Sequence, residues 1–450
     1  MDSVCNFDEK YGCKSELLIV LWIAHIEPIK LTGAKIINVV LFYLYHFFMN
    51  SLFPYLQYTL AILVALGICM FSLPRIILIA KKKKLYDLPD NNRKIHKEVI
   101  PNLGGIGIFF STMIVSSFLI APSESSAWWH YVVTSSLILF IIGLKDDILI
   151  ITPAKKFMAQ ILASVITVVF ADVRLHSLHG ILGVYEMPYW LSVGFSIVGS
   201  TFIINAFNLI DGIDGLAGSI GALCAFSLGI ALAFQGNYNG ACFAFGLLGG
   251  ILGFLRYNRS PARIFMGDSG ALFIGFSISI LSILFINSFT TTVHPYFTTL
   301  IHSPQAALLA ALSVLFIPVF DSFRVFITRI AGGKHPFHAD RTHLHHFLLD
   351  MGFSHNRIIS ILLIANFLII SLALLLQDFN PNIAIIGIFA FSFSLFSLLY
   401  VKRKYRLKKV EAALHTLEKE QKGLNVTAPA SEKKEKAVMS QALPSIAVHS

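Results

Sequence analysis

Residues 205–219 read NAFNLIDGIDGLAGS and follow a long run of apolar residues. The stretch holds two carboxylates, Asp211 and Asp214, and two acids three residues apart can face the same way on a helical turn. Its three glycines let another backbone segment or a ligand approach closely. Acidic side chains in or near lipid are costly and need a structural or chemical reason. Alone, the stretch fits either a polar turn that ends a helix or a site for a hard cation or a phosphate group.

The composition indicates a membrane protein. Of the 450 residues, 56% are hydrophobic and only 13% are charged, which excludes a soluble globule of ordinary composition. Apolar stretches of about 17–25 residues are typical of membrane-spanning helices, and we expect an all-α, polytopic integral membrane protein with about eleven of them. The expected spans are 54–80, 103–121, 129–145, 156–172, 189–206, 217–235, 238–256, 270–288, 305–323, 357–377 and 382–400.

Basic residues are divided unevenly between the two alternating sets of loops. The set that includes Lys81–Lys84, Arg259 and Arg341 is rich in Lys and Arg, whereas the other set contains Arg174 as its single basic residue. Cytoplasmic loops carry the excess of Lys and Arg, so we expect the first set in the cytoplasm. The net charge of +10 therefore reflects topology and anionic lipid, and no nucleic-acid partner is expected.

Every dense polar cluster lies in the cytoplasmic set. GLKDD places Asp146 and Asp147 at the mouth of one span, FMGDSG places Asp268 at the head of another, and six histidines lie within residues 335–355. The first loop adds a basic cluster: Lys94, His96 and Lys97. Clusters that all fall on one side predict a single composite site at the cytoplasmic membrane surface.

The residue types indicate phosphate and hard-cation chemistry. Carboxylates suit Mg²⁺ or Mn²⁺, which prefer oxygen ligands and keep substrate phosphates as partners. Lys, Arg and His around them suit phosphoryl transfer, and the membrane setting favours a lipid substrate. Two alternatives remain open. The histidines could hold zinc, although no cysteine is nearby, or the acids could serve a membrane transporter, which would place polar residues at span centres.

Taken in order, the motifs resemble those of the polyprenyl-phosphate N-acetylhexosamine-1-phosphate transferase family. They read DLPDNNRKIH, GLKDD, NAFNLIDGIDGLA, FMGDSG and HADRTHLHH, and the resemblance covers about residues 50–400. The last motif is similar to that of the undecaprenyl-phosphate GlcNAc-1-phosphate transferase branch, which primes cell-envelope polysaccharides. The phospho-MurNAc-pentapeptide transferase branch stays as the alternative.

The resemblance implies an activity and its partners. N-acetylhexosamine-1-phosphate, with GlcNAc-1-phosphate the first expectation, would pass from a UDP-N-acetylhexosamine to undecaprenyl phosphate, releasing UMP. The reaction would depend on Mg²⁺, with Mn²⁺ as a substitute, at the cytoplasmic face of a bacterial inner membrane. Besides these two substrates, membrane lipid is an expected partner, and a homodimer is left open.

The resemblance also assigns residues to roles. Asp146, Asp147 and Asp268 would be catalytic, and Asp268, Asp147 and Asp214 would bind the metal. Ile150 replaces an acid that the family often has, which moves the expected metal site toward Asp268 and Asp147. Nucleotide and sugar-phosphate binding would fall to Asn208, Asp211, Asp214, Lys94, His96, Lys97, Arg341, His343, His345 and His346.

Four regions follow from these patterns. Residues 1–48 are an N-terminal extension of undecided nature, and 49–401 form the membrane-embedded transferase domain. Residues 402–423 are expected to form a basic amphipathic cytoplasmic helix, because apolar residues lie on one face of a strongly charged segment. Residues 424–450 are rich in Ala, Ser, Pro and Lys and are expected to be disordered.

Overall fold

The computed structural model describes most of the chain from Phe53 to Thr427, with gaps. The described residues are 53–83, 100–120, 122–123, 126–149, 151–288, 301, 303–333 and 343–427. Expectations for residues 1–48, Lys94, His96, Lys97, Arg341 and 428–450 lie outside them. Within the described ranges the named elements are all helices, and β-pairing is limited to one bridge between Ser177 and Glu186. The all-α fold is confirmed. Apart from the first residues of the first helix, the elements discussed below belong to one compact unit, Gln57–Ser450.

Helices cover each of the expected spans, but the count of eleven membrane crossings is not confirmed. Eight helices are long and apolar enough to cross a membrane. They are α4 (Phe53–Lys83), α7 with its π-helical continuation η4 (Pro153–Phe170), α8 (Tyr189–Ile210), α9 (Leu216–Phe234), α10 (Tyr238–Asn258), α11 (Gly267–Ser288), α15 (His355–Leu375) and α16 (Pro381–Thr427).

The other expected spans are not among these eight helices. Helices α12 (Pro304–Val314) and α13 (Phe316–Ala331) pass the same test only as a pair, which is bent by 72°. Helix α5 (Gly104–Leu119) is apolar but has only 16 residues. Helix α6 (Trp128–Ile148) carries three charged residues, Lys145, Asp146 and Asp147, in its last turn. The described residues therefore contain eight to nine candidate spans.

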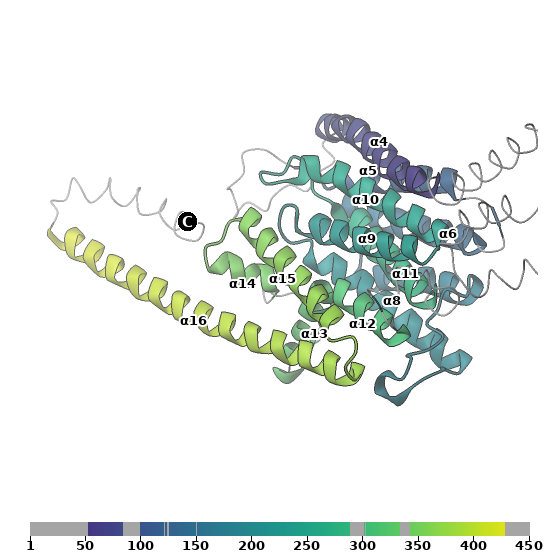
Figure 1. The fold of residues 1–450 in the computed structure, drawn as a ribbon. Helices are drawn as coiled ribbons and strands as arrows, with labels where there is room; N and C mark the ends of the chain where they lie inside the picture. Colours follow the sequence, from purple (N-terminus) through teal and green to yellow (C-terminus); the bar gives the residue numbers. More distant parts are fainter. Residues whose placement is uncertain are drawn as a thin grey trace, which may run out of the picture. The chain divides into compact units, whose positions relative to one another are not determined.

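Helix α11 lies in the interior of the bundle (Figure 1). Its apolar window is buried throughout, and the helix packs against α5, α6, α8 and α9. Close helix packing in lipid depends on small residues at the contact. Gly143 of α6 lies against the first turn of α11, where an added methyl group would come within 2.5 Å of the Ser269 Cα atom. This contact brings the acidic end of α6 beside Asp268.

The bend between α12 and α13 has a side-chain partner for its backbone. A break inside a membrane segment frees backbone groups that must be satisfied within the protein. Asn366 of α15 donates its Nδ2 to the Val314 carbonyl at 3.1 Å and accepts the Ile317 N–H at 3.3 Å. The bend is therefore stabilised by one buried amide.

Two further elements lie at the end of the bundle that carries the polar motifs. Helix α14 (Leu344–Asp350) carries the histidine motif, and α16 continues without a break from the last expected span through the predicted basic helix 402–423. In Figure 1, α16 is the long yellow-green helix that runs past α14.

The contact at Gly143 predicts a stability effect. Gly143→Ala forces a methyl group into the α11 backbone, and overpacking of this kind costs about 1–3 kcal/mol. We expect the melting temperature of the purified protein in detergent to fall by about 2–6 °C. Gly194→Ala on α8 is the control, because its added methyl group meets nothing within 4 Å. Equal melting temperatures for both variants would contradict the proposed packing.

Candidate active site

Asp147 accepts hydrogen bonds from the N-terminus of α11. Its Oδ1 accepts the Asp268 N–H at 2.7 Å, and its Oδ2 accepts the Ser269 N–H at 3.1 Å and the Ser269 hydroxyl at 2.6 Å. The first N–H groups of a helix lack intrahelical partners, and an anion is favourable at that end. Gly267 lies there with φ +72°, and a side chain at this position would press on the Asp147 carboxylate. Asp147 therefore fixes where Asp268 lies.

Lys156, near the start of α7, joins two of the predicted catalytic acids. Its ammonium lies 2.6 Å from Oδ2 of Asp146 and also contacts Oδ2 of Asp268. The other oxygen of Asp268 accepts a hydrogen bond from Nδ2 of Asn208 at 2.9 Å. The side chains are only partly exposed, so this cation and two anions interact in a medium less polar than water.

The NAFNLIDGIDGLAGS stretch forms the end of α8, a turn and the start of α9. Gly215 begins α9 with φ +79°, and its N–H is accepted by the Asn258 side chain at 2.8 Å. Asp214 accepts the Ala262 N–H at 3.3 Å and lies 3.4 Å from Nδ1 of His355. The second acid of the stretch is thus committed to the loop between α10 and α11 and to the start of α15.

The two acids of the stretch differ in ionisation. Burial and the neighbouring carboxylates of Asp147 and Asp214 raise the pKa of Asp211, just past the end of α8, to about 7. Burial also acts to raise the pKa of Asp214, but the contact with His355 and hydrogen bonds from the Ala262 N–H and Ser260 together outweigh it and lower the pKa below its usual value. Asp211 is therefore the acid that changes charge near neutral pH.

The histidine motif is fixed by Asp321 of α13. The Asp321 carboxylate accepts the Leu344 N–H at 3.0 Å, lies 3.0 Å from Nδ1 of His343 and pairs with the buried Arg324 guanidinium at 2.7 Å. Charged groups at such depth are expected to be paired and hydrogen-bonded, as these are. The network sets the start of α14 and so the direction of the histidine side chains that follow.

His345 connects the histidine motif to the DGIDG turn. An added methyl group on Gly212 would collide with Nε2 of His345, so only glycine allows this approach. Burial, followed by the influence of His346, lowers the pKa of His345 to about 3. The ring is therefore neutral at physiological pH. Its Nε2 has no hydrogen-bond partner among the described residues.

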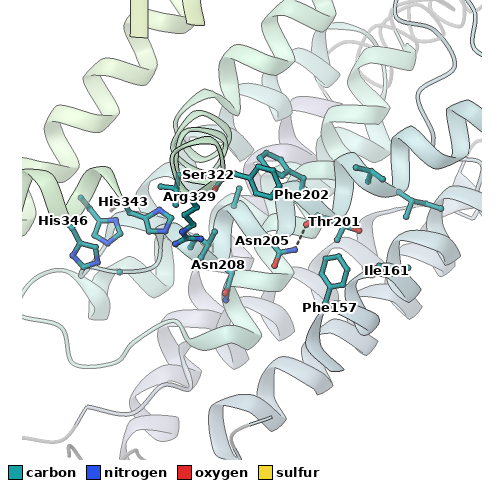
Figure 2. Close-up of a pocket in the computed structure, with 18 residues that line it drawn as sticks. Phe157, Ile161, Thr201, Phe202, Asn205, Asn208, Ser322, Arg329, His343 and His346 are labelled. Carbon is teal, nitrogen blue, oxygen red and sulfur yellow. Dashed lines mark hydrogen bonds between the residues drawn. The ribbon is translucent and has the colours of Figure 1, made fainter. Parts of the chain in front are cut away.

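A cavity of about 570 Å³ opens between α7, α8, α13 and the histidine motif. Figure 2 shows His343, His346 and Arg329 toward one end of the cavity, Asn208 between, and Phe157 and Ile161 toward the other. Its remaining wall is mainly apolar, and Asn205 and Thr201 add polar groups along α8. The cavity thus joins a polar end, beside the Asn208–Asp268 hydrogen bond, to an apolar groove.

The donor set suits a hard cation held partly by substrate. Among the described residues, no group of three or more His, Cys, Asp or Glu side chains is arranged to hold a metal ion. Mg²⁺ commonly takes only one or two carboxylates and fills its shell with water and phosphate. Asp146 and Asp268 already converge on one cation, the Lys156 ammonium. The residues present therefore fit Mg²⁺ in that form.

Most of the predicted site residues are brought together. Asp146, Asp147, Asp268 and Asn208 form one hydrogen-bonded group through Lys156 and α11, and the histidine motif lines the same cavity as Asn208. The carboxylate of Asp147 is hydrogen-bonded to the N-terminus of α11, and that of Asp214 to the loop between α10 and α11. The carboxylates of Asp146 and Asp268 both contact the Lys156 ammonium. The assignment of metal ligands stays a prediction.

Two residues were missed from the sequence. Lys156 stands beside Lys155 in the sequence, and nothing in that pair shows which lysine points inward. Arg329 is one more basic residue of the loop set expected in the cytoplasm, where it had no other assigned role, yet it is buried and lines the cavity. The one available signal was the position of each residue close to an expected span end.

Comparison with known proteins identifies relatives of this chain. The profile of glycosyl transferase family 4 matches residues 129–286, which include the acids and Asn208. The Escherichia coli K12 undecaprenyl-phosphate alpha-N-acetylglucosaminyl 1-phosphate transferase is 29% identical over 346 residues, covering 74% of this chain and 87% of that protein. The Mycobacterium tuberculosis H37Rv decaprenyl-phosphate N-acetylglucosaminephosphotransferase is 30% identical over 291 residues, covering 60% of this chain and 70% of its own length.

A Bacillus subtilis relative extends the same pattern. It is described as a probable undecaprenyl-phosphate N-acetylglucosaminyl 1-phosphate transferase and is 28% identical over 326 residues, covering 72% of this chain and 86% of that protein. The chain belongs to glycosyl transferase family 4. It is a multi-pass membrane member of that family.

The Lys156 contacts predict a stability effect that depends on divalent cations. Lys156→Met leaves Asp146 and Asp268 facing each other without a cation, so we expect a lower melting temperature at pH 8 in metal-free buffer. Millimolar Mg²⁺ should restore it by binding the two carboxylates, and should stabilise the variant more than the wild type. Lys155→Met is the matched control because Lys155 is exposed. If the melting temperature of Lys156→Met is lowered equally with and without Mg²⁺, the result would contradict a cation site between these acids.

Proposed function

We propose that this protein transfers N-acetylglucosamine-1-phosphate from UDP-N-acetylglucosamine to undecaprenyl phosphate and releases UMP. The names of its relatives in Escherichia coli and Bacillus subtilis support undecaprenyl phosphate as the acceptor and N-acetylglucosamine-1-phosphate as the group transferred. The structural observation that carries the proposal is the junction of a polar, charged centre with an apolar groove in a single cavity. Such a junction suits a reaction between a nucleotide sugar and a lipid phosphate.

The reaction exchanges one phosphorus–oxygen bond for another. An oxygen of the lipid phosphate forms a bond to the sugar-linked phosphorus of the donor, and the bond from that phosphorus to the UMP oxygen breaks. UMP leaves as a phosphate anion, and the product carries the sugar on a diphosphate linked to the lipid. Phosphate is already an anion at neutral pH, so the main demand on the protein is to position reactants and offset negative charge.

The apolar groove is assigned to the lipid chain. Phe157 and Ile161 line the cavity away from the histidines, on a helix that is long and apolar enough to cross the membrane (Figure 2). An isoprenoid chain placed there exchanges lipid surroundings for protein packing and brings its phosphate toward Asn208. The polar residues Asn205 and Thr201 lie along the same helix as Asn208.

The polar end is assigned to the donor diphosphate. The Arg329 guanidinium supplies positive charge there, and arginine matches phosphate oxygens in geometry. His346 lies at the same end, and His345 keeps a neutral ring whose Nε2 has hydrogen-bonding capacity to spare. The Lys156 ammonium adds a positive charge that contacts the Asp268 carboxylate, and the same carboxylate accepts the hydrogen bond from Asn208.

Mg²⁺ is part of the proposal, with Mn²⁺ as a substitute. Asp268 and Asp146 would hold it, and when bound it would offset charge on the donor diphosphate. Asn208 orients one Asp268 oxygen by its hydrogen bond, and Asp147 holds Asp268 at the head of α11. We place the reaction at the cytoplasmic face of a bacterial inner membrane, supported by the basic loops on the side where these residues lie.

The alternatives fit less well. A transporter would need its acids near span centres, whereas Asp146, Asp211 and Asp268 lie at helix ends. A phospho-MurNAc-pentapeptide transferase has no support among the names of the three relatives described. The N-acetylglucosamine reading is therefore the one we adopt.

The direct test measures release of radiolabelled UMP from UDP-N-acetylglucosamine and undecaprenyl phosphate by the purified protein with Mg²⁺. Asp268→Asn should lower turnover at least about a hundredfold, because it removes a charge beside the reacting phosphates. His179→Ala, in the loop before α8 and away from the cavity, should stay near wild type. Absence of metal-dependent turnover with a panel of UDP-N-acetylhexosamines would refute the proposal. An equal loss of turnover in Asp268→Asn and His179→Ala would contradict a single site at the cavity.

A further inference from the structure

Helix α14 is too short to hold its own position. It has seven residues, and isolated helices below about 12–15 residues are marginal in water. It nevertheless carries His345 and His346, which line the cavity. The placement of the histidine motif therefore depends on the groups that contact α14 from other elements.

Asp321 fixes one end of α14, as described above, and α16 covers one of its faces. The Phe347 ring of α14 lies 5.2 Å from the Phe396 ring and 6.2 Å from the Tyr400 ring, between ring centroids. The Arg324 guanidinium carbon lies 4.2 Å from the Phe396 centroid, so the Asp321 network contacts the same aromatic group. Such packing restricts how α14 can rotate.

Two arginines of α16 fix the other end. Arg403 Nε donates to Oδ2 of Asp350, the last residue of α14, at 2.8 Å, and its guanidinium carbon lies 4.1 Å from the Phe347 centroid. Arg406 donates to the Met351 carbonyl, just past the helix end. Positive groups are favourable at a helix C-terminus, where carbonyls lack intrahelical partners.

These contacts are specific to two positions of a very basic segment. The Arg403 side chain is 21% exposed, whereas Lys402 and Lys404 on either side are exposed. A helix that serves only to bind anionic lipid needs no specific ion pair such as that between Arg403 and Asp350. The cytoplasmic part of α16 therefore has a second role besides membrane attachment.

We propose that Arg403 and Arg406 are positioning residues that hold the histidine motif against the cavity, so that the C-terminal helix completes the donor site. The inference rests on the proposed function, because it assigns the histidine end of the cavity to the donor diphosphate. It adds that the cytoplasmic extension of α16 is part of the working enzyme.

The kinetic test uses the full-length protein in detergent. Arg403→Ala should raise the KM for UDP-N-acetylglucosamine about tenfold through misplacement of the histidines, while the KM for undecaprenyl phosphate stays unchanged. Arg403→Lys keeps the charge and should recover most of the loss. Lys404→Ala, one residue along on the same helix, is the matched control and should behave like wild type.

A double-mutant cycle separates the ion pair from general damage. Asp350→Ala should also raise the donor KM, and the double variant should be no worse than Arg403→Ala alone, because Arg403→Ala already removes the ion pair. Additive losses, or a change in the KM for the lipid instead of the donor, would overturn the positioning role.

Amide hydrogen exchange tests the positioning contact without any substrate. Arg403→Ala, and more so Arg403→Ala with Arg406→Ala, should speed exchange in residues 344–352 and leave α11 at wild-type rates. Unchanged exchange in α14 overturns the inference even if the protein uses no UDP-sugar, whereas absent turnover with faster exchange counts against the proposed function alone. Faster exchange with an unchanged donor KM also overturns the inference.

Discussion

The hydrogen bonds from the N-terminus of α11 to Asp147 are the interaction on which the site depends. Two backbone N–H groups and one hydroxyl at the head of the central helix converge on a single carboxylate from α6. The helix is buried along its apolar length, so its end cannot shift independently of α5, α6 and α8. The position of the Asp268 side chain is set by this arrangement. Lys156 and Asn208 contact Asp268, and Lys156 also contacts Asp146.

Glycine is the second constraint, because the polar motifs approach one another more closely than side chains would allow. Gly267 makes room for the Asp147 carboxylate, Gly212 for the His345 ring, and Gly143 for the α11 backbone. The glycines next to the acids are thus explained by packing as well as by ligand access. In the NAFNLIDGIDGLAGS stretch, the sequence predicted close approach but not the partner, which is a histidine more than a hundred residues later.

The sequence predicted the membrane fold well, because apolar length and loop charge are local properties of the chain. The helices fall on the expected spans, but bending at α12–α13 and the short α5 depend on packing, so the number of crossings could not be read from hydropathy. Motif position singled out Asp268 and Asn208, which the structure places in hydrogen-bond contact. It could not separate Lys156 from Lys155, nor reveal that Arg403 of the basic tail contacts Asp350, since both depend on distant elements.

The central claim is that Asp146 and Asp268 form a cation site that shares its occupant with a nucleotide phosphate. Calorimetric titration of UMP into the purified protein, with and without Mg²⁺, tests it most directly. The account predicts that UMP binds the wild type only when Mg²⁺ is present, and that Asp146→Asn weakens this binding. UMP binding of equal strength without Mg²⁺, or unaffected by Asp146→Asn, would contradict it.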